Sequence, residues 1–261
     1  MQIGIHITTY NRLDFTEKCL KSLFWSNADN YELVIVDNNI SDNTKEFLRD
    51  LKHPSLKKVI FNNENRHLGY AVNQGWNEMK HSCDVLAWIN NDFLFEPLWN
   101  KNVVSCFTEL NLDYISGLTN LTHKQKIPTS EPKATPSGQG HYVLSENVGA
   151  AYFLLTKHFI NGFAPSIEPW YKGYTGPGPS FHYSLKKLRG VRLLSPGLLL
   201  INPEYTSKKF KAYYNEVFSI RGLELLLSKF QTQELKTGAA QGITWFEFLK
   251  QYYPQVTNGG E

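Results

Sequence analysis

The first ninety residues alternate between short apolar runs and segments in which apolar residues recur every three or four positions. Apolar runs of strand length occupy residues 3–7, 33–36, 56–61 and 85–89. Helical spacing predicts helices over residues 13–25 and 44–51, and a third with a buried face of Val72, Trp76 and Met79. This alternation predicts an α/β fold with a mostly parallel sheet and helical crossovers.

Polar residues follow three of these apolar runs directly. The polar tips read Thr8-Thr9-Tyr10-Asn11, Asp37-Asn38-Asn39 and Asn90-Asn91-Asp92. The carboxyl ends of parallel strands share one edge of an open α/β sheet, and ligands bind at that edge. We therefore expect the three tips to meet at one site. Asn11 is also a good N-cap for the helix expected from Leu13.

The second half of the chain has weaker periodicity. Residues 119–139 and 164–179 are rich in Pro, Gly and polar or aromatic residues, which predicts two long loops. Between them, residues 150–155 read as a strand that is followed by a short helix. Residues 191–201 read as a further strand, and helical segments are expected at 184–188, 217–230 and 244–252.

These patterns predict three regions within one compact domain. We interpret residues 1–117 as a nucleotide-binding half, residues 118–206 as a smaller substrate-contacting region and residues 207–261 as a helical C-terminal tail.

Composition narrows the class of protein. A chain of 261 residues with 41% hydrophobic and 20% charged residues can bury the core of an independent globular enzyme. Cys19, Cys83 and Cys106 are far apart and lack metal-ligand spacing, which predicts reduced thiols and a cytoplasmic protein. No signal core or membrane-spanning run is present, so we expect neither secretion nor a transmembrane segment. The net charge of +3 suits an anionic ligand such as a nucleotide without requiring a polyanion.

The polar tips each have a chemical and a purely structural interpretation. Thr8-Thr9-Tyr10-Asn11-Arg12 lies at the positive end of a predicted helix, which suits phosphate, or it is simply a capped turn. Asp37 suits ribose hydroxyls or a base edge, or it closes an Asx turn. Asp92 suits Mg²⁺ or Mn²⁺, or it belongs to a turn before Pro97. The absence of a GxGxxG segment or a P-loop argues against dinucleotide dehydrogenases and Walker-type NTPases.

Four segments together resemble the family 2 glycosyltransferases, which have the GT-A fold. They are TTYNR at residues 8–12, VIVDNNISD at 34–42, ENRHLGYAVNQG at 64–75 and WINNDFLFEP at 88–97, in the order and spacing of the family. The resemblance covers the first hundred residues. It implies a GT-A sheet flanked by helices and a nucleotide-sugar donor.

The resemblance also implies roles for individual residues. The implied donor-binding residues are Thr8, Thr9, Tyr10, Arg12, Asp37, Asn39, Asn65, Gly69, Asn73 and Asn90. Asn90 and Asp92 occupy the two ends of the DxD motif of the family, with an amide in place of the first carboxylate. Asp92 is then the principal ligand of Mg²⁺ or Mn²⁺.

The resemblance continues into residues 118–206, which it implies to be an acceptor-side region, and then fades. Residues 148–155 are similar to the small-residue strand of the family, which implies acceptor contacts at Gly149 and Ala150. Trp170 is a candidate stacking surface for a sugar or a base. Where the family has an acidic Glu-Asp-x-Asp segment, this chain has Pro179-Ser180-Phe181-His182. The general base is then His182 or Glu168, or the acceptor needs little base assistance.

The expected function is transfer of a sugar from a nucleotide-sugar to an acceptor hydroxyl, with inversion at the anomeric carbon implied by the resemblance alone. A glycan is the first expectation for the acceptor and a modified DNA base the second. The alternatives are a catalytically inactive nucleotide-sugar-binding module and a nucleotidyltransferase. The sequence leaves open the donor, the linkage, strict metal dependence and the oligomeric state, and Asn202 stands where relatives often have a metal-binding histidine.

Overall fold

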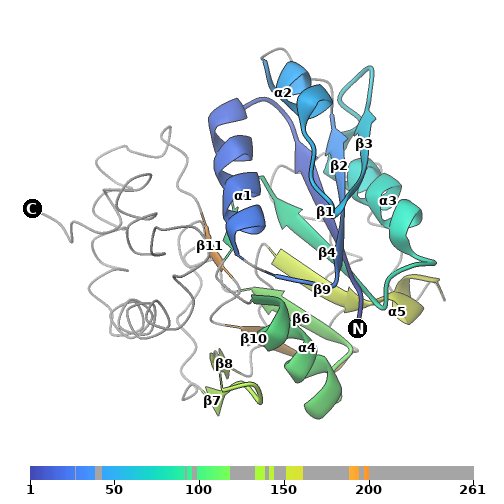
Figure 1. Ribbon diagram of the computed structural model, residues 1–261. Helices are drawn as coiled ribbons and strands as arrows, with labels where there is room; N and C mark the ends of the chain where they lie inside the picture. Colours follow the sequence, from blue (N-terminus) through green and yellow to red (C-terminus); the bar gives the residue numbers. More distant parts are fainter. Residues whose placement is uncertain are drawn as a thin grey trace, which may run out of the picture. The chain divides into compact units, whose positions relative to one another are not determined.

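Figure 1 shows the computed structural model of the chain, labelled by element. The structure describes residues 1–26, 28–38, 43–91, 93–95, 99–117, 133–138, 141–143, 151–160, 188–193 and 197–199. The helices expected in the C-terminal tail lie outside these residues, as does nearly all of the helix expected at 184–188. The division at residues 117 and 206 therefore stays a prediction.

A nine-stranded mixed sheet forms the centre of the described fold. Its order is β3 (Leu56–Phe61), β2 (Tyr31–Asp37), β1 (Ile3–Thr9), β4 (Val85–Asn90), β9 (Ala151–Leu155), β6 (Tyr114–Gly117), β10 (Gly190–Leu193), β8 (His141–Val143) and β7 (Lys133–Ala134). The first four strands are mutually parallel, and β9 runs antiparallel between β4 and β6. The expected α/β fold with a mostly parallel sheet flanked by helices is confirmed.

Helices cover both faces of the parallel strands. The helices of the described residues are α1 (Leu13–Trp25), α2 (Thr44–Asp50), α3 (His67–Met79), α4 (Trp99–Glu109) and α5 (Thr156–Ile160). In Figure 1, α1 and α3 lie on opposite sides of β1, β2 and β4. The α1 bounds and the β3 bounds agree with the ranges expected from sequence.

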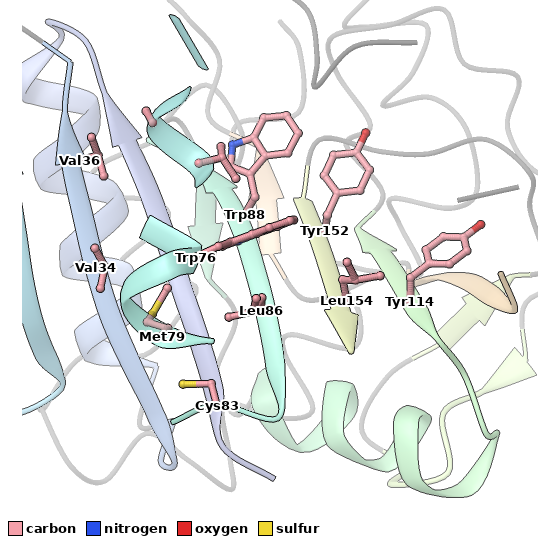
Figure 2. Packing of buried hydrophobic residues seen from close by; sticks show 12 residues of the cluster. Val34, Val36, Trp76, Met79, Cys83, Leu86, Trp88, Tyr114, Tyr152 and Leu154 are labelled. Atoms are coloured by element: carbon pink, nitrogen blue, oxygen red, sulfur yellow. The ribbon is translucent and has the colours of Figure 1, made fainter. Parts of the chain in front are cut away.

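Under α3, alternate side chains of the strands form one apolar layer. Val34, Val36, Leu86 and Trp88 project toward Trp76 and Met79 of the helix, and Figure 2 shows them packed together. The layer extends across the sheet to Tyr152, whose ring stacks on Trp88 with centroids 5.0 Å apart. Side chains alternate between the two faces along a strand. The polar residues two positions beyond these apolar residues therefore also point toward α3.

The opposite face of the sheet packs on α1 and α4 through aromatic side chains. Phe93 and Phe95 belong to β5 (Phe93–Phe95), which forms a separate two-stranded sheet with β11 (Gly197–Leu199). Phe95 contacts Trp99 of α4, and Trp99 contacts Phe153 of β9. These three side chains are fully buried.

Several elements differ from the sequence-based expectation. The helix α4 and the strands β5 and β6 were not expected. The apolar positions of α4 do have helical spacing, but its Asn, Ser, Thr and Val residues are poor helix formers, so packing on the sheet decides its conformation. The single strand expected over 191–201 occurs as β10 and β11, in two different sheets. β7 also interrupts the long loop expected over 119–139.

All three cysteines are buried and free, as expected from their spacing. Burial raises the pKa of the Cys83 and Cys106 thiols to about 11, which makes both poor nucleophiles. No helix in the described part of the chain is long and apolar enough to cross a membrane.

Candidate functional site

The carboxyl ends of β1, β2 and β4 meet at one edge of the sheet. Thr9 lies opposite Asp37 in the parallel register of β1 and β2, and Thr8 lies opposite Asn90 in the register of β1 and β4. The Asn38 backbone N–H donates to the Thr9 carbonyl at 2.9 Å, which ties the two strand ends together. The predicted meeting of the three polar tips is therefore present for these residues.

Alternation sends neighbouring residues of each tip to opposite sides of the sheet. Asn38 and Asn90 lie on the α3 side, in line with Val36 and Trp88. Asn91 lies on the α1 side, where its Nδ2 donates to Thr16 Oγ1 at 3.0 Å. By the same alternation Thr8 faces α3, and the fully buried Thr9 and Asp37 face α1.

The turn between β1 and α1 has an unusual backbone. Asn11 and Arg12 both have positive φ, at 55° and 63°. Asparagine adopts this left-handed conformation readily, whereas for arginine it costs on the order of 1–3 kcal/mol. The N-cap is Arg12 and it makes no side-chain capping bond, so the expectation that Asn11 caps α1 is wrong.

This turn holds Tyr10 and Arg12 at the surface beside the strand ends. Tyr10 is 50% exposed. The Arg12 guanidinium carbon lies 5.6 Å from the centre of the Phe15 ring, and the Arg12 carbonyl accepts the backbone N–H groups of Phe15 and Thr16. An aromatic ring and a guanidinium thus border the buried Thr9–Asp37 pair.

A ladder of side-chain amides joins the end of β2 to the start of α3. Asn38 Nδ2 donates to Asn65 Oδ1 at 2.9 Å, and Asn38 Oδ1 accepts the Arg66 backbone N–H at 3.0 Å and Asn62 Nδ2 at 3.1 Å. Asn62 and Gln74 then exchange two hydrogen bonds of 2.9 and 3.0 Å. The ladder fixes the position of the first turn of α3 against the sheet.

Sequence reasoning missed this role of Asn38, Asn62 and Gln74. Asn65 was expected to contact the donor, yet its Oδ1 accepts both Asn38 Nδ2 and the His67 backbone N–H. The sequence signal for this role is an Asn directly after each of two consecutive strands, Asn38 after β2 and Asn62 after β3. Only the spatial arrangement shows that these amides bond to one another.

Two other expected donor residues lie on α3 itself. Gly69 is buried and Asn73 is half-buried. They are four residues apart, so they lie on the same side of the helix one turn from each other.

The tip of β4 supplies oxygen and amide groups. Asn90 is half-buried, and its carbonyl accepts the Cys19 thiol at 3.7 Å. Asp92, the expected metal ligand, lies outside the described residues. Among the residues that the structure describes, no group of three or more His, Cys, Asp or Glu side chains is arranged to hold a metal ion.

The expected acceptor side adjoins this edge. β9 begins at Ala151, and Tyr152 lies opposite Trp88 in the antiparallel register, so the chain enters β9 at the edge where β4 ends. Several expected site residues lie outside the described residues: Asn39, Gly149, Ala150, Glu168, Trp170 and His182.

Comparison with known proteins agrees with this arrangement. The model of the family described as glycosyl transferase family 2 matches residues 4–134, half of the chain. A dolichyl N-acetyl-alpha-D-glucosaminyl phosphate 3-beta-D-2,3-diacetamido-2,3-dideoxy-beta-D-glucuronosyltransferase of Methanococcus voltae is 29% identical over 154 residues, which are 57% of this chain and 41% of that protein. Glycosyltransferase GlyA of Streptococcus pneumoniae serotype 4 is 27% identical over 106 residues, 39% of this chain and 15% of that protein. The matches thus span less than half the length of either relative.

Solved structures share the fold at low identity. S. aureus TarS 1–349 in complex with UDP-GlcNAc has a TM-score of 0.62 at 13% identity, over 98% of this chain and 82% of that one. The mannosyltransferase PcManGT from Pyrobaculum calidifontis, in complex with GDP-Man and Mn²⁺, has a TM-score of 0.57 at 12% identity, over 100% and 76%. The likeness shows the GT-A fold. Because the family model matches half of the chain, including all three strand ends of the site, the chain belongs to glycosyl transferase family 2.

Proposed function

We propose that this chain is a glycosyltransferase that moves a sugar from a nucleotide-sugar to an acceptor hydroxyl. The observation that carries the proposal is the register that brings Thr8, Thr9, Asp37 and Asn90 to one sheet edge. That edge of an α/β sheet is where nucleotides bind. Family membership supports the same activity.

The nucleotide part of the donor would lie over the ends of β1 and β2. The Asp37 carboxylate would accept hydrogen bonds from ribose hydroxyls or a base edge, and Thr9 would contact the same group. Tyr10 would stack on the base through its exposed ring, and Arg12 would pair with the diphosphate. Asn39 would add a polar contact to the nucleotide.

The sugar and phosphate side of the donor would run along the start of α3. Asn65, Gly69 and Asn73 would line this part of the site. The buried Gly69 presents no side chain, which lets a ligand approach the helix backbone closely. Asn73 would supply an amide to a sugar hydroxyl.

Asn90 and Asp92 would hold a divalent cation. The polar groups at this edge are hydroxyl, amide and carboxylate oxygens, and their chemistry suits Mg²⁺ or Mn²⁺ rather than a thiolate-bound metal. When bound, the ion would offset the negative charge of the leaving diphosphate. The PcManGT complex with GDP-Man and Mn²⁺ supports a metal in a protein of this fold.

The acceptor would enter beside the start of β9. Gly149, Ala150 and Trp170 would form its binding surface, and His182 or Glu168 would take the hydroxyl proton as general base. An in-line attack from the face opposite the diphosphate would invert the anomeric configuration. The protein would align the hydroxyl and the anomeric carbon and exclude water from them.

A glycan is the proposed acceptor class. The name of the M. voltae relative combines a glucuronosyl transfer with a dolichyl N-acetylglucosaminyl phosphate, which supports a saccharide acceptor over a modified DNA base. The three buried free thiols fit the reducing cytoplasm expected from sequence. Parallel assays with glycan acceptors and with hydroxymethylated duplex DNA separate the two acceptor classes.

The donor half is tested first. Thermal unfolding is followed in the presence of nucleoside diphosphates and nucleotide-sugars, with and without Mn²⁺. We expect one nucleotide to raise the Tm of the protein more than the others do. Asp92→Ala should abolish turnover and metal-dependent donor binding, while Asp50→Ala, at an exposed position of α2, should change neither. Unchanged turnover in Asp92→Ala would reject the assigned role.

The same experiments distinguish the alternatives. Tight nucleotide-sugar binding without transfer or hydrolysis would indicate a binding module. Release of pyrophosphate from a nucleoside triphosphate and a sugar phosphate would indicate a nucleotidyltransferase.

A further inference from the structure

A fully buried histidine lies next to a candidate donor-binding hydroxyl. His6 is in β1, and its side chain points toward α3. Its Nε2 lies 2.7 Å from Thr8 Oγ1, two residues along the same face of the strand. Its cross-strand neighbours are Val34 and Trp88, both buried and apolar. Neither the family resemblance nor the roles proposed above assign His6 a task.

The His6 ring is neutral in the folded protein. Burial lowers its pKa from 6.5 to about 3, because the charged imidazolium loses its hydration there. A neutral imidazole has one N–H donor and one lone-pair acceptor, on different nitrogens. In the contact with Thr8, the tautomer therefore decides whether His6 Nε2 donates the hydrogen bond or accepts it.

The surroundings of Nδ1 select the tautomer. In the described structure Nδ1 has no hydrogen-bond partner, and it faces the α3 backbone at Gly75. A Cβ built on Gly75 would overlap Nδ1, so the glycine hydrogen in that direction points at the nitrogen. A C–H group is weakly positive, and it is compatible with a lone pair on Nδ1 but not with a second N–H. The proton then resides on Nε2.

An Nε2–H group donates to Thr8 Oγ1, which fixes the orientation of the Thr8 hydroxyl. The oxygen acts as the acceptor in this bond, so the hydroxyl proton is directed elsewhere. Thr8 is only half-buried and lies at the strand end next to Asn90. Its proton is thus available to an acceptor atom at the sheet edge.

We propose that His6 is a positioning residue that holds the Thr8 hydroxyl as a hydrogen-bond donor to an oxygen of the bound nucleotide. The inference rests on the proposed donor site and adds the direction of one hydrogen bond and the residue that sets it. The oxygen belongs to the phosphates or to the nucleoside. Both kinds of oxygen accept hydrogen bonds.

The tautomer is tested without any ligand. In ¹⁵N-histidine-labelled wild-type protein, the His6 ring should show a protonated Nε2 and an unprotonated Nδ1 at neutral pH. Its signals are assigned by their loss in His6→Gln, since the chain has eight histidines. A protonated Nδ1 would overturn the proposal, because Nε2 would then be an acceptor and the Thr8 hydroxyl would donate its proton to His6.

The effect on ligand binding is tested with a double-mutant cycle. Thr8→Val should weaken binding of the preferred nucleoside diphosphate about tenfold, the usual effect of one lost hydrogen bond. Thr8→Ser, which keeps the hydroxyl, should lose less. His6→Leu should weaken binding in the Thr8 background and not in the Thr8→Val background. His6→Gln, whose amide reaches the Nε2 position, should lose less affinity than His6→Leu.

The outcomes separate this inference from the proposed function. Additive losses for His6→Leu and Thr8→Val would overturn the inference while nucleotide binding by the wild type stands. No nucleotide binding by the wild type would overturn the donor site itself, and with it the ligand part of the inference. Coupling that requires phosphate places the accepting oxygen on the diphosphate, and coupling with the nucleoside alone places it on the base or ribose. Where His6→Leu fails to fold, the tautomer and the comparison of Thr8→Ser with Thr8→Val decide.

Discussion

Thr9 and Asp37 lie directly opposite each other where β1 and β2 end, and both are fully buried. Few carboxylates are buried so completely unless they are paired or serve a ligand. Tyr10 and Arg12 stand beside this pair at the surface. If Asp37 contacts the nucleotide, removing its charge should weaken nucleotide binding.

Asp37→Asn should weaken binding of the preferred nucleotide by at least about tenfold, because a charge-assisted hydrogen bond becomes a neutral one. Isothermal titration calorimetry measures the affinity. Asp50→Asn removes a carboxylate at an exposed position of α2 and should bind like the wild type. Equal affinities for Asp37→Asn and the wild type would remove Asp37 from the site.

Asn38→Ala should lower the free energy of unfolding by about 2–3 kcal/mol. The substitution deletes three hydrogen bonds, so Asn62, Asn65 and the Arg66 N–H each lose the partner that Asn38 supplies. Urea unfolding followed by circular dichroism gives the difference. Asn77→Ala, which removes an exposed amide from the last turn of α3, should cost less than about 0.5 kcal/mol. A loss of that smaller size for Asn38→Ala would contradict a structural role of the ladder.

Gly75→Ala should destabilise the protein by about 1–3 kcal/mol, although alanine is the better helix former. The new Cβ would overlap the His6 ring, which is held by its contact with Thr8 and by full burial. Adding His6→Ala should relieve the overlap, so the double variant should lose less than the sum of the single variants. Thermal unfolding of the four proteins provides the cycle. Additive losses would mean that His6 and Gly75 do not touch.

Acid should destabilise the wild type more than His6→Gln. The folded pKa of His6, about 3, lies below its value of 6.5 in the unfolded chain. Between pH 6.5 and pH 3 the unfolded state therefore binds one more proton, and stability falls as pH falls by about 1.4 kcal/mol per pH unit. Above pH 6.5 both states are neutral at this residue and its contribution is constant.

The measurement is the difference in unfolding free energy between the two proteins at several pH values. Other titrating groups are common to both proteins, so they cancel to first order. Parallel curves across pH 4–6 would show that His6 is accessible to protonation in the folded protein.

Sequence reasoning predicted the parallel half of the fold because its apolar runs are long and continuous. Residues 33–36 and 85–89 are buried in β2 and β4, and short continuous apolar runs of this kind, bounded by polar residues, are typical of parallel strands covered on both faces. The approach of Asp37 to Thr9 followed from parallel order alone. The α4 helix was missed because its residues have weak intrinsic preference and its conformation depends on packing.

The polar contacts of the site were less accessible to sequence reasoning. The partners of Asn38 are 24 to 28 residues away along the chain, and their identity depends on distances that only the folded structure sets. The same holds for His6, which resembles an ordinary core residue until its Nε2 is seen beside Thr8. The left-handed Arg12 had no sequence signal, because arginine rarely adopts that conformation.

Side chains of adjacent residues at the strand ends point to opposite faces of the sheet, so the two residues have different roles. In Asp37-Asn38 and in Asn90-Asn91, the first residue is a proposed ligand contact. The second residue bonds to another part of the chain, Asn38 to the segment before α3 and Asn91 to α1. Substitutions at adjacent positions should therefore have different effects: one lowers stability and the other lowers ligand binding. Changes at Asn38 and Asn91 should be repairable by stabilising substitutions elsewhere, and those at Asp37 and Asn90 should not.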